Sequence, residues 1–318
     1  MKINSYLPKK KTKQNKFAVN LEKLKSKYIL QNIFNICSKY KLLLIVKYNK
    51  KIQNRLDIGI NDYKEYSGIF TPIEIEIVPD KYEFGKFINE IFVPYCHIYF
   101  GDNMHEIKRN FINYQDKISK IKIILDYRIK SFESLFISCR CIEIITFKKM
   151  YRNNITNMRC MFYDCKSLKE INLSNFHTEN VTDMSKMFCL CTSLKELNIS
   201  NFNTKNVTNM SEMFNGCESL YRLDLSNFNT ENVTDMHFMF HDCVSLRLLD
   251  ISSFNTSKVT RMNGMFSDCS SLKDINISHF NFDKIESIVA MFRGCKKELT
   301  KKIRQQNDKM EIEAFYDI

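Results

Sequence analysis

The chain repeats itself with a step of 26 residues over much of its length. An internal repeat constrains the fold more than any other sequence feature, because each copy must form the same structural unit. Several columns of one residue type keep this step without a gap, which predicts stacked units that share one core. The columns are Cys139, Cys165, Cys191, Cys217, Cys243, Cys269 and Cys295; Phe136, Phe162, Phe188, Phe214, Phe240, Phe266 and Phe292; Met161, Met187, Met213, Met239, Met265 and Met291; and Phe176, Phe202, Phe228, Phe254 and Phe280.

One copy, residues 182–207, predicts the local structure of a unit. Its apolar residues from Met184 to Cys191 follow the i, i+3, i+4, i+7 spacing of one helix face. Leu194, Leu197 and Ile199 then have the LxxLxL spacing of a short strand. We therefore predict units of strand, loop and helix.

The copies TENVTDMSKMFCLCTSLKELNISNF and TENVTDMHFMFHDCVSLRLLDISSF resemble the BspA-like leucine-rich repeat proteins, whose pattern is close to NVTDMSxMFxxCxSLxxLxLSxF. This resemblance implies a solenoid that binds proteins and has no enzymatic activity. Many members of that family are secreted or surface-attached adhesins, so the resemblance also opens that role for this chain.

The predicted fold class is α/β: a leucine-rich-repeat solenoid of strand-loop-helix units, preceded by a small helical or α+β cap region. The solenoid, with about seven units, is expected over residues 121–300, starting with a strand at Ile121–Asp126. Within the cap, isoleucines that alternate with glutamates from Ile73 to Ile77 predict a half-exposed strand. A second strand is predicted at Tyr95–Phe100 and a short helix over 104–117. The full predicted order is a basic disordered tail (1–16), a basic helical region (17–70), a small α+β cap (71–120), the solenoid, and a charged C-terminal cap or tail (301–318).

Residues 1–56 form a basic arm, with 15 Lys and Arg against the single acidic residue Glu22, whereas residues 131–318 hold 23 of each sign. Such an arm can bind nucleic acid or another anionic surface, or remain a solvated terminus. Within it, residues 24–46 faintly resemble an F-box, which implies recruitment of a ubiquitin-ligase adaptor; the alternative is a plain helical cap.

The densest apolar run, Leu42–Val46, is too short for a signal peptide or a transmembrane segment. We therefore expect a cytoplasmic protein, with a nuclear location left open. In a reducing compartment the twelve cysteines should be thiols, and those of the column should be buried, although neighbouring units would bring column cysteines within bridging range.

The sequence contains no convincing catalytic constellation. The glycines are scattered rather than gathered into a phosphate-binding loop, and no histidine is paired with a nucleophile in a repeated pattern. His237, His241 and Cys243 could place three metal ligands along one helix, but the two histidines occupy outward, variable positions of the repeat. We predict no enzymatic activity, no cofactor and no metal.

The outward strand positions are the expected binding surface, where Tyr and Arg would serve as anchors. We predict a monomeric interaction scaffold that binds a protein partner there. The alternatives are an F-box-like ubiquitin-ligase substrate receptor and a secreted or surface adhesin. The candidate surface consists of Asn172, Asn198, Tyr221, Arg222, Asp224, Arg247, Leu248, Asp250, Lys273 and Asn276.

Overall fold

The computed structural model describes residues 26–27, 30–31, 43, 46–59, 61–63, 71–103, 105–306 and 312–315, in two compact units, Met1–Gly68 and Ile69–Ile318. In the first unit, helix α4 (Lys50–Arg55) begins after Asn49, whose side chain accepts a hydrogen bond from the Ile52 amide. Ile52 packs against Leu30 and Val46. The predicted tail and most of the F-box-like segment lie outside the described residues.

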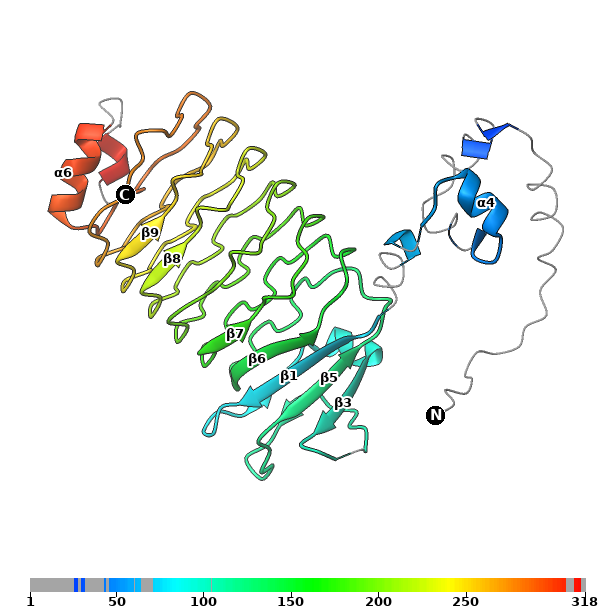
Figure 1. Cartoon of the computed structure of the whole chain (residues 1–318). Helices are drawn as coiled ribbons and strands as arrows, with labels where there is room; N and C mark the ends of the chain where they lie inside the picture. Colours follow the sequence, from blue (N-terminus) through cyan, green and yellow to red (C-terminus); the bar gives the residue numbers. More distant parts are fainter. Residues whose placement is uncertain are drawn as a thin grey trace. The chain divides into compact units, whose positions relative to one another are not determined.

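The second unit begins with a five-stranded sheet in the order β3-β5-β1-β6-β7 (Figure 1). Strand β1 is antiparallel to β5 and β6, whereas β6 and β7 are parallel. The change of direction at β6 is therefore where the cap passes into the repeats. The strands are β1 (Ile73–Pro79), β3 (Cys96–Phe100), β5 (Ile121–Leu125), β6 (Ile142–Lys149) and β7 (Glu170–Asn172).

Two predicted strands of the cap are confirmed. Every second residue of β1 is buried, as the alternation from Ile73 predicted, and β3 occupies the second predicted segment. Strand β5 also forms, but its antiparallel pairing with β1 and β3 makes it part of the cap sheet rather than the first strand of the stack.

The remainder of the cap is irregular. Strands β2 (Gly85–Lys86) and β4 (Phe111–Ile112) form a small antiparallel pair, and η1 (Glu90–Tyr95) is a 3-10 helix. Residues 105–117 contain β4 and turns where a helix was predicted.

The predicted α/β fold class, a solenoid of strand-loop-helix units, is wrong. Residues 130–296 are all described and contain no helix. In the second unit the described helices are η1, α6 (Lys297–Gln306) and η2 (Ile312–Phe315), all outside this range. Strands lie in three separate sheets, the third being β8 (Arg222–Asp224) with β9 (Leu248–Asp250), so the described chain is mostly strand and turn.

Two tight turns replace the helix predicted in each repeat. Between Met184 and Cys191, turns are closed by hydrogen bonds from Met187 N to Met184 O (3.3 Å) and from Cys191 N to Phe188 O (3.1 Å). The third residue of each turn, Lys186 and then Leu190, has a positive φ of 57° and 59°. This geometry is typical of type II turns and excludes an α-helix. The two turns direct the same apolar side chains toward the core as a helix would.

The backbone of this turn face (residues 183–191 and their equivalents in other repeats) bonds to the next repeat. Met184 N donates to Asn209 O at 3.1 Å and Phe188 N donates to Met213 O at 2.9 Å. Lys186 N and Leu190 N donate in the same way to Ser211 O and Asn215 O. Every second amide is thus used between repeats, so neighbouring repeats lie side by side along the stack (Figure 1).

Side chains stack in the same register inside the repeats. Successive rings of the Phe136–Phe292 column lie 5.3–5.8 Å apart and nearly parallel. Each column cysteine from Cys165 onward donates its thiol to the carbonyl of the phenylalanine 29 residues earlier, at 3.0–3.2 Å. The cysteines that the structure describes are free, and burial raises the pKa of the Cys191 thiol well above its ordinary value.

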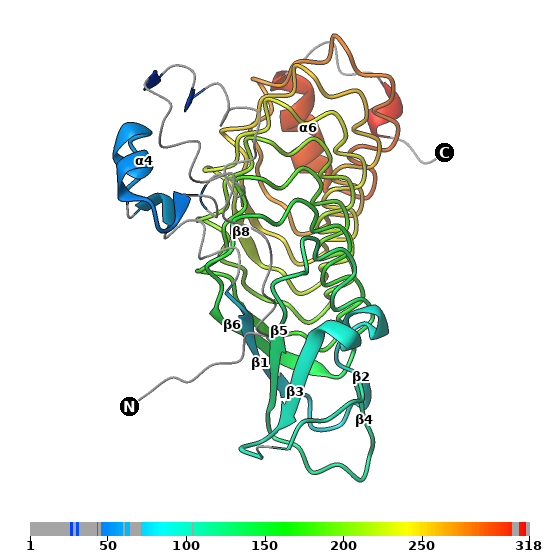
Figure 2. The ribbon, with the colours of Figure 1, turned by 90° about the vertical axis from the view of Figure 1, so that its right-hand side faces the viewer.

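The C-terminal elements close the stack, as Figure 2 shows for α6. The Gln306 side chain donates to Ile275 O (2.9 Å) and accepts from Ile277 N (2.8 Å). These two bonds satisfy backbone groups at the open edge of the last repeat. On the turn side, Phe292 N donates to Ala314 O at 2.7 Å. Phe315 adds a last ring to the phenylalanine column, 5.8 Å from Phe292. Covered edges of this kind prevent pairing with other chains.

Replacing Phe214 by alanine should lower the free energy of unfolding by about 3–5 kcal/mol, because the ring is fully buried between two others and leaves a cavity. Urea unfolding followed by circular dichroism measures the loss. Tyr114→Ala, at a side chain that is 75% exposed, should change stability by less than about 0.5 kcal/mol. Equal stability of the Phe214 variant and the unmodified chain would contradict the assigned core.

Alanine substitution at two glycines should separate backbone strain from steric clash. Gly264 and Gly101 have almost the same φ, +61° and +60°, but a Cβ at Gly264 would lie 2.1 Å from the Phe238 ring, whereas Gly101 has open space. Gly101→Ala should therefore cost about 1 kcal/mol through its left-handed backbone alone, and Gly264→Ala more. Adding Phe238→Ala should bring the Gly264→Ala penalty close to that at Gly101. A penalty at Gly264 that persists in the Phe238→Ala background would refute the contact.

Candidate functional site

The strand face consists of the outward residues on the strand side of successive repeats. Parallel pairing of β8 with β9 places Arg222 opposite Leu248 and Asp224 opposite Asp250. Leu223 is buried between its two exposed neighbours. Every predicted surface residue is exposed, including Tyr221, Arg247 and Lys273, which stand just before the alternating residues. The ten residues are Asn172, Asn198, Tyr221, Arg222, Asp224, Arg247, Leu248, Asp250, Lys273 and Asn276.

The Asn and Asp column of this face has a structural task. Asp224 Oδ1 accepts a hydrogen bond from Ser226 N at 2.9 Å, and Asn172 Oδ1 accepts one from Ser174 N at 3.0 Å. Such bonds form Asx turns that end each strand. Hydrogen bonding from Ser226 also lowers the pKa of Asp224. Asn198, Asp250 and Asn276 make the equivalent bonds.

The most distinctive part of the strand face surrounds Tyr221. The Arg247 guanidinium lies 5.4 Å from the centroid of the Tyr221 ring, a cation–π contact between neighbouring repeats. Tyr221 is 44% exposed and Leu248 60% exposed. An aromatic ring, a guanidinium and an aliphatic side chain therefore lie together on the surface, a combination favoured in protein interfaces.

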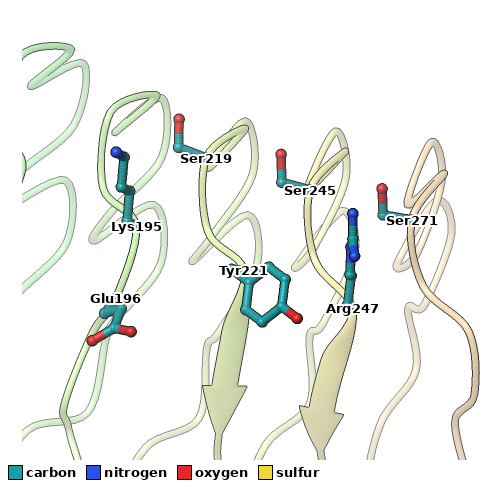
Figure 3. A pocket seen from close by; sticks show the side chains of 7 residues that line it. All are labelled: Lys195, Glu196, Ser219, Tyr221, Ser245, Arg247 and Ser271. Carbon is teal, nitrogen blue, oxygen red and sulfur yellow. The ribbon is translucent and has the colours of Figure 1, made fainter.

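Two shallow hollows lie side by side on this region. The first, of about 470 Å³, is lined by Lys195, Glu196, Ser219, Tyr221, Ser245, Arg247 and Ser271 (Figure 3). The second lies over β8 and β9. Between them they contain all the predicted surface residues except Asn172 and Asn198. The second hollow is lined by Arg222, Asp224, Arg247, Leu248, Asp250, Lys273 and Asn276, by the exposed Ser252 and Asp274, and by Leu223, Leu249 and Ile251.

The prediction missed the serines of the first hollow. Ser219, Ser245 and Ser271 each stand directly before the buried leucine of their repeat. The SL dipeptide was therefore interpreted as part of the repeat motif. The signal that could have found them is their constant position next to the outward column of Tyr221 and Arg247.

A charged cluster lies on the turn face instead of the strand face. His237 Nδ1 is 2.6 Å from Asp235 Oδ1, and its Nε2 is 3.4 Å from Glu212 Oε1. Lys186 and Arg261 complete the cluster through Glu212 and Asp235. Hydrogen bonds to Asp235 and Glu212 raise the pKa of His237 to about 9, and the bond from His237 lowers the pKa of Glu212 to about 2. His237 is thus an ion-pair partner in a partly buried position.

The metal-ligand trio considered from sequence is not brought together. Cys243 is buried and donates its thiol to Phe214 O. A different trio, His241, Asp242 and Asp268, has donor atoms within 4.8 Å of one another. However, Asp268 Oδ2 already accepts from the Arg293 guanidinium at 2.8 Å. We assign no metal ion to this cluster.

The chain belongs to the family described as Mycoplasma protein of unknown function, DUF285, whose model matches residues 130–245 and 217–314. These two ranges contain the 26-residue repeats, whereas membership of the BspA-like family itself stays a prediction. None of the curated proteins compared matches the chain.

The chain is also similar to the solved structure of a leucine rich cell surface protein from Faecalibacterium prausnitzii A2-165. The two are 25% identical with a TM-score of 0.28, and the match spans 42% of this chain and 38% of that one. Among the described residues, no helix has the length and apolarity to cross a membrane.

Replacing His237 by asparagine should destabilise the protein in a pH-dependent way. Because the folded-state pKa of about 9 lies above the ordinary 6.5, the ion pairs of His237 stabilise the fold fully below pH 6.5, and this contribution is lost as the pH rises through 9. The difference in unfolding free energy between the two proteins should therefore be larger below pH 6.5 than above pH 9. Chemical denaturation across this range measures it. A difference in unfolding free energy that does not change with pH would contradict the assignment. So would an equally large pH-dependent difference for His279→Asn, at an exposed histidine.

Proposed function

We propose that this chain is a non-enzymatic interaction protein that binds a partner protein through the strand face. The observation that supports this most strongly is the exposed group of Tyr221, Arg247 and Leu248 between two hollows. Tyrosine and arginine are the residue types that most often anchor interfaces, and here the ring and the guanidinium are already held together in the free protein. This pre-organisation lowers the entropic cost of binding.

The absence of enzymatic activity is part of the proposal. A nucleophilic cysteine requires an accessible thiol of low pKa, whereas burial raises the pKa of Cys217 and Cys243 well above the ordinary value. His237, whose pKa is raised, is already paired with the carboxylates of Asp235 and Glu212. These contacts suit a structural role for both residue types.

We further propose that the protein acts as a monomer in the cytoplasm. The thiol-to-carbonyl bonds of the cysteine column require reduced sulfur, which a reducing compartment maintains. The F-box-like alternative and nucleic-acid binding by residues 1–56 depend mostly on residues outside the described ranges, and they stay predictions, as does the adhesin alternative.

A triple variant tests the proposed binding face. Tyr221→Ala, Arg247→Ala and Leu248→Ala together should reduce recovery of the partner at least about tenfold, because each anchor contributes on the order of 1–2 kcal/mol. The experiment is affinity capture from the source cells with mass spectrometry, followed by calorimetry with the purified partner. The matched control removes an exposed aromatic, a cation and an aliphatic elsewhere: Tyr114→Ala, Lys205→Ala and Ile312→Ala.

The control variant should capture the same partners as the unmodified chain. If both triple variants retain the partner equally, the strand face is not the binding site. If the unmodified chain recovers no protein above an unrelated bait, the proposed function itself fails.

A further inference from the structure

The first hollow, called the serine hollow below, collects hydrogen-bond donors that the protein itself leaves unused. Across the described part of the chain, the hydroxyls of Ser219, Ser245 and Ser271 have no side-chain hydrogen bond. Within the same ranges, the Lys195 ammonium and the Arg247 guanidinium form no ion pair. Some cations of the repeats are paired, as Lys169 is with Glu143 at 2.9 Å, whereas Arg222 and Lys273 on the same face form no ion pair within the described residues either.

The arrangement of these groups favours negative charge. Figure 3 shows the three hydroxyls at the same level of successive repeats, with Lys195 and Arg247 extending toward that level. The hollow contains one carboxylate, Glu196, which the same view shows directed the other way. Two cations and three hydroxyls can therefore approach one ligand together, and hydrogen bonds between charged groups are the stronger kind.

The spacing of the cations indicates more than one anionic group. Paired strands lie about 4.8 Å apart, so Lys195 and Arg247, two repeats apart, are separated by about 10 Å along the stack. A single phosphate would contact both only if the two side chains bent toward each other along the stack. A peptide in the extended polyproline II form advances about 3.1 Å per residue and brings every third side chain back to the same face, so carboxylates three residues apart match this distance. Lys273 continues the row in the next repeat.

We propose that the serine hollow binds an acidic segment of a partner protein, which lies in extended form across the repeats. Its carboxylates contact Lys195 and Arg247, and the three serine hydroxyls donate to carboxylate or backbone oxygens between them. The contact with Tyr221 holds the guanidinium of Arg247 in place before binding. This inference rests on the proposed function and adds the chemical class of the partner.

The test uses fluorescein-labelled peptides with one glutamate in every third position, (Glu-Gly-Gly)₄, and the uncharged analogue (Gln-Gly-Gly)₄. Fluorescence anisotropy with the full chain should show binding of the glutamate peptide that weakens with added salt. The variant Lys195→Gln/Arg247→Gln should bind it about tenfold more weakly. The control Lys205→Gln/Lys258→Gln, which removes equal charge from loop positions, should bind like the unmodified chain.

Equal binding of both peptides, no binding of the glutamate peptide, or equal affinity of the two double variants would overturn the inference. So would full displacement by inorganic phosphate, or stronger binding of an oligothymidylate that the Lys195→Gln/Arg247→Gln variant loses, because either result would indicate a phosphate or nucleic-acid site in the hollow. If partner capture depends on Tyr221, Arg247 and Leu248 while these peptide results are negative, the partner segment is not acidic, but the strand face is still the binding site.

Discussion

The structure depends on the use of every second amide of the turn face to bond the next repeat. Amides such as Met184 N and Phe188 N point along the stack rather than back to their own repeat. The third residue of each turn is left-handed, and with this geometry the alternate amides bond to the next repeat. An α-helix would use the same amides internally and could not be joined to its neighbours in this way.

The stacking of the phenylalanine rings and the thiol-to-carbonyl bonds both follow from that register. Backbone bonding fixes the distance between repeats, so phenylalanine rings of neighbouring repeats meet at stacking distance and each cysteine thiol reaches the carbonyl of the preceding repeat. The same register leaves open edges at both ends. The antiparallel sheet around β1 covers one end, and Gln306 with η2 covers the other.

The sequence predicts which residues form the core but not the backbone that holds them. Phe214 and Cys243 are fully buried, as their columns predicted. The i, i+3, i+4 spacing cannot distinguish a helix from two successive turns, because both direct the same side chains inward. Gly216 and Gly264 were the available signal for left-handed turns, but most equivalent positions hold residues such as Lys186 and Leu190 that give no such indication.

The sequence predicted which residues of the candidate site are exposed, but not which hydrogen bonds they make. Alternation around Leu223 correctly indicated exposure of Arg222 and Asp224. Outward position alone did not reveal that the Asn and Asp column forms turns, or that unpaired serine hydroxyls line the neighbouring hollow. Both depend on contacts between repeats, which the pattern of a single repeat does not contain.

Hydrogen exchange with mass spectrometry, comparing the free chain with its complex with the captured partner, tests the central claim that the strand face is the binding element. The account predicts slower exchange on binding in peptides that cover 195–198, 219–224, 245–250 and 271–276, with no change in the turn-face segments around 184–191 and 210–217. Protection confined to the turn face, or to residues 1–56, would contradict it.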